Sequence, residues 1–300
     1  MMSAAGYVLL ADRGVLALHG GDVRPFLQGL ISNDVAHVRK DRAAYGALLT
    51  PQGKFLFDFF IVEDAGQLLL ETEGTRLEAL HRRLLMYRLR SKVDIEDCSA
   101  HFAVAALIGD DPAATLNLPE LPGAARALDR GLVFVDPRLP RLGARALLPK
   151  NTATETLAAL GLEEVEREAY ERLRLTLGVP DGSRDLVVEK ATLLESGFEE
   201  LNGVDFDKGC FVGQELTARM KYRGLVRKRL LPVTFTGAPP PPGTVIRLGE
   251  REAGEMRSGI DGQGLALLRL EQVEKAKAEG VPLLAGHTEI LPVAPTWANH

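Results

Sequence analysis

Three apolar runs of strand length follow one another in the first quarter of the chain, and they constrain its fold more than any other feature. They span residues 45–49, 55–62 and 68–71. The turns between them are short, namely Pro51-Gln52-Gly53 and Asp64-Ala65-Gly66. Apolar runs joined by so few residues pair as neighbouring antiparallel strands. The pattern therefore predicts an antiparallel β-meander.

A helix is expected directly after the meander. Thr75 and Glu78 match a capping box, and leucines at helical spacing continue to about Arg90. A strand over residues 92–96 completes an α+β unit. The next segment repeats this organisation, with strands near residues 104–108, 132–135 and 144–148 and a helix from about Thr152. The sequence thus predicts an α+β fold with two related units in series.

Four consecutive prolines, Pro239 to Pro242, interrupt the C-terminal part of the chain. Proline is excluded from helix interiors and central strands, so this stretch is either a linker or a stiff turn. Strand-like runs over residues 230–235 and 244–248 lie on either side of it. We therefore expect a rigid turn within a small C-terminal β-domain.

Composition and charge narrow the kinds of protein to which the chain can belong. It has 46% hydrophobic and 26% charged residues, which is typical of a globular protein with a sizeable core. Lys and Arg total 36 against 41 Asp and Glu, so the net charge is −5. The chain therefore lacks the overall basic charge of a duplex-binding protein, and any anion-binding surface must be local.

The cysteines and the N-terminal sequence bear on metal sites and location. Cys98 and Cys210 are the only two cysteines, too few for a disulfide framework or a four-thiolate site, so no resident metal is expected. Residues 1–15 lack the charged and apolar regions of a secretory signal, and no stretch approaches the roughly 20 apolar residues that span a bilayer. We expect a cytoplasmic protein without a membrane segment.

Common catalytic motifs are absent from the sequence. Residues 46–54 have the wrong glycine spacing for a P-loop, and Gly262-Gln263-Gly264 lacks the third glycine of a dinucleotide fingerprint. No two histidines are four residues apart, as a zinc metalloprotease helix requires, and there is no Gly-x-Ser-x-Gly motif.

Cys210 lies in the most unusual segment of the chain. Lys208 precedes it by two residues, Gly209 and Gly213 flank it, and a helix is expected to begin just after it. A nearby cation and the positive end of a helix dipole both stabilise a thiolate, so the pattern predicts a reactive thiol. The alternative is a buried, inert cysteine, which is our interpretation of Cys98 beside Asp97.

A strongly basic segment follows. Six cations and no acid occur in residues 219–229: Arg219, Lys221, Arg223, Arg227, Lys228 and Arg229. This local charge suits a multiply charged anion, such as polyglutamate, phosphate or RNA. Only Tyr222 is nearby as a stacking platform, which argues against direct nucleic-acid binding. A second basic cluster, in residues 82–92, fits a solvated helix face.

Residues 208–215, of sequence KGCFVGQE, with Arg219 and Arg223-Gly224, resemble the signature of the folate-binding YgfZ family. That family is related to the glycine-cleavage T-protein, an aminomethyltransferase, and includes mitochondrial iron-sulfur assembly factors. The similarity covers nearly the whole chain, with further matching segments at residues 21–35, 48–54 with Asp58, 87–93 and 172–180.

The resemblance implies a T-protein-like core of two interlocked α+β units around a central folate pocket, followed by a small C-terminal β-barrel. On this basis we place the core at residues 1–229, with its two units at roughly 1–98 and 99–229, and the barrel at residues 230–300.

The resemblance also implies tetrahydrofolate binding and a role in assembling or repairing [4Fe-4S] enzymes, including tRNA-modifying ones. Iron-sulfur client or assembly proteins would be the partners. Cys210 would be the reactive or transiently ligating thiol, with Lys208 holding it as thiolate. A resident cluster is not expected, because one thiolate cannot supply its ligands. The residues expected to bind the folate and fix the loop are Asp58, Gln214, Glu215, Arg219, Arg223 and Arg227.

Two other hypotheses remain open. The T-protein branch has paired aspartates where Phe57 and Asp58 align, and a glutamate at the position of Thr176, so the transferase residues are incomplete here. A folate-dependent one-carbon transferase, with Asp58 as base or electrostatic anchor, is therefore the second hypothesis. The third is a catalytically silent scaffold that binds client proteins or tRNA through the two basic clusters.

Overall fold

The computed structural model describes residues 5–128 and 131–298, and the chain divides into two compact units. Unit one consists of Met1–Leu49, Leu56–Tyr170 and Asn202–Val212. Unit two consists of Thr50–Phe55, Glu171–Leu201 and Gly213–His300. Both units combine segments that are far apart in the sequence.

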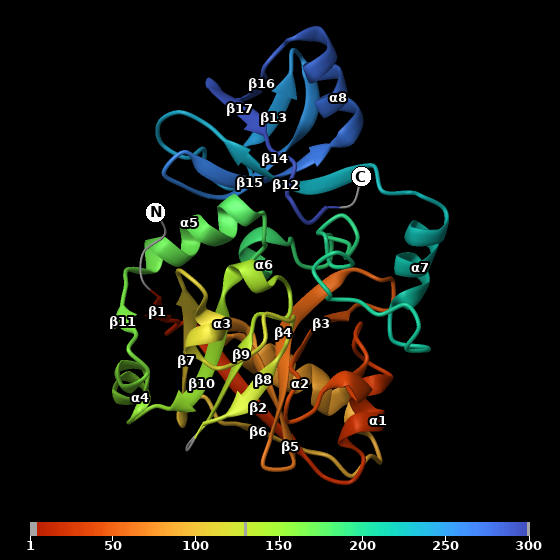
Figure 1. The fold of residues 1–300 in the computed structure, drawn as a ribbon. Coiled ribbons are helices and arrows are strands. Elements are labelled where there is room, and N and C mark those ends of the chain that lie inside the picture. Colours follow the sequence, from red (N-terminus) through yellow and green to blue (C-terminus); the bar gives the residue numbers. More distant parts are fainter. Residues whose placement is uncertain (1–4, 129–130, 299–300) are drawn as a thin grey trace. The chain divides into compact units, whose positions relative to one another are not determined.

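Unit one contains two β-sheets (Figure 1). The five-stranded sheet has the order β3-β4-β5-β2-β6, and the six-stranded sheet has the order β11-β1-β7-β10-β9-β8. The strands are β1 (Gly6–Leu9), β2 (Arg13–His19), β3 (Ala44–Leu49), β4 (Phe55–Asp64), β5 (Gln67–Glu73), β6 (Asp94–Asp97), β7 (Phe102–Ile108), β8 (Ala125–Ala127), β9 (Leu132–Val135), β10 (Ala144–Pro149) and β11 (Glu163–Glu164). The predicted meander is confirmed as β3, β4 and β5.

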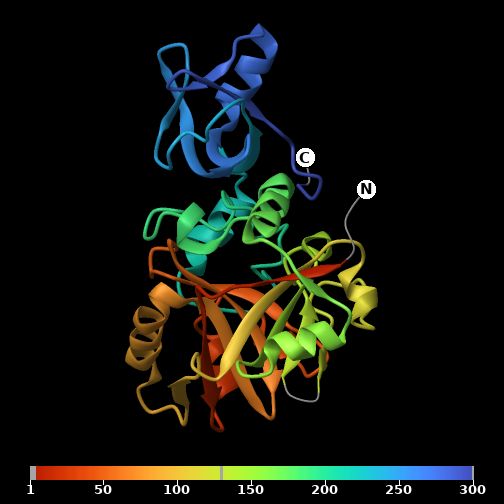
Figure 2. The same ribbon diagram turned by 90° about the vertical axis from the view of Figure 1, so that its left-hand side faces the viewer.

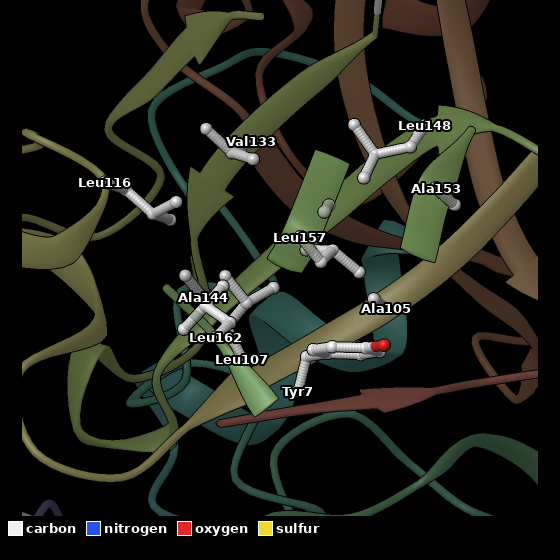
Figure 3. Close-up of a cluster of buried hydrophobic side chains, with 11 residues drawn as sticks. Tyr7, Ala105, Leu107, Leu116, Val133, Ala144, Leu148, Ala153, Leu157 and Leu162 are labelled. Carbon is white, nitrogen blue, oxygen red and sulfur yellow. The ribbon is translucent and has the colours of Figure 1, made fainter. Parts of the chain in front are cut away.

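Helices cover the sheets of unit one. Helix α2 packs against β2 and β6 of the five-stranded sheet, as Figure 2 shows from the side. Helix α4 packs on the six-stranded sheet through a buried cluster that includes Leu157, Tyr7, Leu107 and Val133 (Figure 3). The helices are α1 (Val23–Gln28), η1 (Val35–His37), η2 (Gly74–Arg76), α2 (Leu77–Arg88), α3 (Pro112–Thr115), η3 (Pro140–Leu142) and α4 (Ala153–Ala159).

The other face of the six-stranded sheet turns toward the five-stranded sheet. Successive strand residues point to opposite faces, so Ala144, Ala146 and Leu148 of β10 contact the α4 side while Arg145 points to the other. The Arg145 guanidinium lies 4.0 Å from the ring centroid of Phe60 on β4. The two sheets are therefore joined through a buried layer that is partly charged.

This layer contains a network of buried ion pairs. Arg145 donates to Glu71 at 2.8 Å and lies 3.5 Å from Asp136, which Arg138 binds at 2.8 Å, and Arg13 also binds Glu71. Burial alone would raise the pKa of Asp136, but Arg138 and Arg145 lower it below its ordinary value. The Asp136 carboxylate thus remains charged inside the unit.

Unit two contains a closed β-barrel with the strand order β12-β15-β14-β13-β16-β17. Its strands are β12 (Lys228–Thr234), β13 (Val245–Leu248), β14 (Arg251–Ile260), β15 (Gln263–Arg269), β16 (Leu283–Ala285) and β17 (Thr288–Pro292), and its helices are α5 (Arg167–Leu177, shared with unit one), α6 (Gly182–Asp185), α7 (Gln214–Tyr222) and α8 (Leu270–Glu279). The prolines connect β12 to β13, as predicted. The α+β fold class with a C-terminal barrel is confirmed.

The expected capping box before α2 is wrong. Helix α2 begins at Leu77 with Arg76 as its N-cap, and the Thr75 hydroxyl instead donates to the Glu73 carboxylate at 2.9 Å. The helix also ends at Arg88, two residues earlier than predicted, because Leu89 adopts a φ of +44°. A positive φ in leucine interrupts the helical hydrogen-bond pattern.

Candidate functional site around Cys210

Cys210 is exposed to solvent in the loop of residues 202–213, which precedes helix α7. Its neighbours Gly209 and Gly213 have φ values of +88° and +83°. These left-handed conformations suit glycine and turn the chain sharply on both sides of the thiol. The alternative of a buried, inert cysteine does not describe this residue.

Lys208 attaches the loop to the end of helix α1. Its ammonium donates to the carbonyl oxygens of Gln28 and Ile31 at 2.6 and 2.7 Å and lies 5.1 Å from the ring centroid of Phe211. Burial lowers the pKa of Lys208 to about 8, although Asp34 and Asp205 act in the opposite direction. The structure thus places this cation on backbone carbonyls, and its action on the thiol stays a prediction.

Further hydrogen bonds attach the loop to residues 28–33. The Gln28 amide donates to the carbonyl of Lys208 at 3.1 Å, and the Val212 amide donates to Gly29 at 3.1 Å. The buried Ser32 hydroxyl donates to Gly203 at 2.6 Å. Both sides of Cys210 are therefore held by one short segment of unit one.

Asn33 extends this attachment into the five-stranded sheet. Its side-chain amide donates to the carbonyls of Asn202 and of Tyr45 on β3, both at 2.7 Å. The loop is consequently bonded to a segment that is itself bonded to the sheet. A reactive group held this way keeps a defined position, which functional sites require.

Three possible metal ligands lie beside Lys208. Asp34, His37 and Asp205 each offer one ligand atom, and these atoms lie within 4.8 Å of one another. The Asp34 carboxylate already accepts a hydrogen bond from Ala36 at 2.8 Å, and both carboxylates interact with the Lys208 ammonium. This ammonium balances part of their negative charge.

Helix α7 carries three of the predicted site residues, Gln214, Glu215 and Arg219. Within unit two it packs closely on the turn at Gly53, where an added Cβ would lie 2.7 Å from both the Gly213 carbonyl oxygen and Leu216 Cβ. The matching segment at residues 48–54 thus contacts the start of α7.

The basic segment after α7 is only partly neutralised. Lys221 pairs with Glu199, and Arg229 pairs with Glu200 at 2.5 Å. Arg223, at the C-cap of α7, and Arg227 are exposed. Among the described residues, no ion pair to either arginine is found. These two side chains could bind an anion.

Asp58 lies in a different environment, on β4 in unit one. It is 4% exposed, and one carboxylate oxygen accepts a hydrogen bond from the Tyr45 hydroxyl at 2.7 Å. Burial and the adjacent Asp58 raise the pKa of Tyr45 well above its ordinary value, so the hydroxyl stays protonated. The burial of Asp58 therefore does not support its predicted role as an anchor for a pterin ring.

Sequence reasoning missed Gln28, Ser32 and Asn33 as site residues. They belong to the segment at residues 21–35, which resembles the known family, but their contacts lie about 170 to 180 residues away along the chain. A single sequence shows no such pairing. Covariation between the two segments is the signal that could have shown it.

Comparison with known proteins identifies relatives over most of the chain. The mouse and human proteins called "Iron-sulfur cluster assembly factor IBA57, mitochondrial" are each 35% identical to it over 287 and 285 residues. In both cases the alignment covers 88% of this chain and 78% of the relative. Residues 227–300 match the family of CAF17 C-terminal β-barrel domains.

A solved structure has the same fold. The glycine cleavage system aminomethyltransferase T from Bartonella henselae superposes with a TM-score of 0.77 at 18% identity, covering 98% of this chain and 86% of that one. The predicted T-protein-like fold is therefore confirmed, while the domain boundaries at residues 98 and 229 stay a prediction.

The prediction of a cytoplasmic protein is wrong by this comparison, because the relatives are named as mitochondrial proteins. The lack of a secretory signal does not argue against a mitochondrial location, because mitochondrial targeting uses amphipathic, Arg-rich segments. Within residues 5–128 and 131–298, no helix has the length and apolar character needed to cross a membrane.

Proposed function

Because the chain belongs to the family of the iron-sulfur cluster assembly factor IBA57, we propose that it acts in the assembly or repair of [4Fe-4S] proteins through the thiol of Cys210. In this proposal the cluster is cargo. Cys210 supplies one thiolate to it, or reacts with a damaged cluster, while a client or assembly protein supplies the remaining ligands.

The observation that carries the proposal is the exposed Cys210 thiol on a loop attached at both sides. A thiol that exchanges a cluster with another protein must be accessible and must keep its position. Gln28 and Lys208 hold the loop before Cys210, and Gly29 holds Val212 after it. Cys98, by contrast, is only partly exposed, and burial together with Glu96 and Asp97 raises its pKa.

Tetrahydrofolate binding is a second part of the proposal. The exposed Arg223 and Arg227 fit the anionic glutamate tail of a folate. Arg223 is the C-cap of α7, the helix that carries Gln214, Glu215 and Arg219, and Arg227 follows it in the chain. The buried Asp58 fits a pterin anchor poorly. The relation to the YgfZ branch and a role for tRNA-modifying clients also belong to this proposal.

The one-carbon transferase hypothesis receives less support from the geometry. A base or electrostatic anchor for a small amine must be able to contact it. Asp58 is buried and accepts the Tyr45 hydroxyl bond, and Phe57 occupies the neighbouring position on β4. We therefore rank this hypothesis below the iron-sulfur role.

The experiment that tests the proposal is complementation of cells that lack this protein, under mild oxidative stress. The readout is the product of a [4Fe-4S]-dependent tRNA methylthiotransferase. Wild type and Cys98→Ala should restore the modification, and Cys210→Ala should not. Equal rescue by Cys210→Ala would make the thiol dispensable, and failure of wild type to rescue would contradict the iron-sulfur role itself.

A further inference from the structure

The C-terminal end of helix α2 carries an exposed apolar surface that the proposed function does not use. Leu89 is 87% exposed and Met86 is 69% exposed, while Leu85 beside them is also exposed. The apolar residues of the opposite face, Leu77, Leu80 and Leu84, are buried in unit one. We call Leu85, Met86 and Leu89 with the surrounding cations the Leu89 patch.

Leu89 is held in a conformation that leucine rarely adopts. Its φ is +44° and its ψ is −106°, outside the regions favoured by residues with a side chain. Unfavourable backbone conformations persist only where surrounding structure imposes them, and they cluster at functional positions. The strain therefore calls for an explanation beyond the turn itself, since glycine would make this turn without strain.

The turn after Leu89 is bonded to the start of helix α1. The Lys92 amide donates to the Asp22 carboxylate at 2.8 Å, and the Asp22 amide donates back to the Lys92 carbonyl at 3.3 Å. At Gly20, an added Cβ would lie 2.2 Å from the Lys92 carbonyl oxygen, so the two segments are in close contact. Leu89 is thus presented on a constrained turn.

The chain segment that contains Leu89 is basic, although the Asp22 carboxylate lies beside it and accepts the Lys92 amide. Residues 82–92 contain no acid and five cations: Arg82, Arg83, Arg88, Arg90 and Lys92. Arg82 lies 3.7 Å from Glu78, and both side chains are exposed. Such an ion pair is weak, so Glu78 neutralises little of the Arg82 charge. An acidic surface would complement the charge of this basic segment, and an apolar pocket would complement the exposed Leu89 side chain.

We propose that the Leu89 patch is a docking site for an acidic protein surface with an apolar pocket that receives Leu89. A protein fits better than a lipid bilayer, because an interfacial helix needs a broad apolar face and that of α2 is buried. The inference does not rest on the proposed function, since the patch and the Cys210 loop are formed by different residues.

The test uses the full chain with the photo-crosslinker benzoylphenylalanine at position 89, in cells where it is the sole copy of this protein. Leu121, an exposed leucine of unit one at 61%, is the matched control position. We expect a crosslink from position 89, mapped to a partner segment rich in Asp and Glu with apolar neighbours. Arg82→Glu with Arg90→Glu should weaken it at least about tenfold.

Several results would overturn the proposal. They are no crosslink from position 89, an equal crosslink from position 121, a crosslink to lipid or to a second copy of the chain, and a crosslink that survives the charge reversal. Leu89-dependent binding of the purified protein to phosphatidylglycerol vesicles would also overturn it, in favour of a membrane surface.

A second variant separates docking from folding. Leu89→Gly removes the apolar side chain and relieves the strained backbone, so it should raise Tm by roughly 2–4 °C while abolishing docking. If Leu89 served only the fold, the stabilised Leu89→Gly variant would still crosslink to the partner from a probe at Met86. Retention of that crosslink by Leu89→Gly contradicts the proposal.

Discussion

The side-chain amide of Gln28 donates a hydrogen bond of 3.1 Å to the carbonyl oxygen of Lys208, across a sequence separation of 180 residues. The Lys208 ammonium donates in return to the Gln28 carbonyl oxygen at 2.6 Å. Each side chain therefore binds the backbone of the other residue. Through this reciprocal pair, the end of helix α1 determines where the loop that carries Cys210 lies.

The first prediction concerns Gln28→Glu. Glutamate still accepts the bond that Gln28 receives from the Val35 amide, but it cannot donate to Lys208. Loss of one such bond costs about 1 kcal/mol, so amide hydrogen exchange at Val212 should accelerate about fivefold. The control Gln67→Glu, at the start of β5, should leave it unchanged. Equal exchange in Gln28→Glu would show that the bond does not hold the loop.

A second prediction follows from the lowered pKa of Lys208, about 8 in the folded protein. The unfolded chain has the ordinary, higher lysine pKa, so it binds more protons than the folded state between these two values. The contribution of Lys208 to the unfolding free energy therefore rises with pH from about 8 to about 10.4.

Urea unfolding of wild type and Lys208→Met measures this contribution. The difference in unfolding free energy, wild type minus variant, should increase between pH 7.5 and pH 9.5. Lys150→Met, which removes an exposed lysine, is the control for the loss of a positive charge. A difference for Lys208→Met that is independent of pH would contradict the burial of its ammonium.

The third prediction concerns the buried ion network of unit one. Arg145→Met leaves Glu71 and Asp136 with fewer cationic partners inside the unit, and breaking a buried network costs about 3–5 kcal/mol. Arg167→Met breaks an exposed pair with Asp12 and should cost less than about 1 kcal/mol. Chemical denaturation measures the unfolding free energy of both variants. A similar loss of unfolding free energy in the two would contradict a large stabilising contribution from the buried network.

The sequence was sufficient to predict some parts of this fold and not others. Apolar runs and short turns define β3, β4 and β5 locally, and the prolines between β12 and β13 restrict their own backbone. The layer of Arg145, Glu71 and Asp136 could not be predicted, because Glu71 on β5 lies 74 residues before Arg145 on β10. The hydrogen bond from Lys92 to Asp22, beside the strained Leu89, likewise joins residues 70 positions apart.

The candidate site was predicted to a similar extent. Cys210 and Lys208 stand out because a thiol, a cation and two glycines occur within six residues. The role of Gln28 and Ser32 arises from long-range contacts that local pattern cannot show. Asp58 was selected by alignment to a relative, whereas its burial against Tyr45 depends on the packing of β3 and β4.

A fourth prediction tests the proposed folate tail site. The double variant Arg223→Glu with Arg227→Glu should weaken binding of tetrahydrofolate pentaglutamate at least about tenfold, because both cations face solvent and suit carboxylates. Binding of the monoglutamate should change less than about twofold. The exposed Arg251→Glu on β14 is the control, and calorimetry is the measurement. Equal weakening of both ligands would place the tail elsewhere.

Whether the Cys210 thiol handles a cluster can be measured as repair of an oxidised [4Fe-4S] tRNA methylthiotransferase in an extract from cells that lack this protein. Purified wild type, Cys98→Ala or Cys210→Ala is added back, and the rate of reactivation is followed. We expect wild type and Cys98→Ala to restore the rate, and Cys210→Ala to leave it at the level of the untreated extract. Full reactivation with Cys210→Ala would contradict the claim that this thiol handles the cluster.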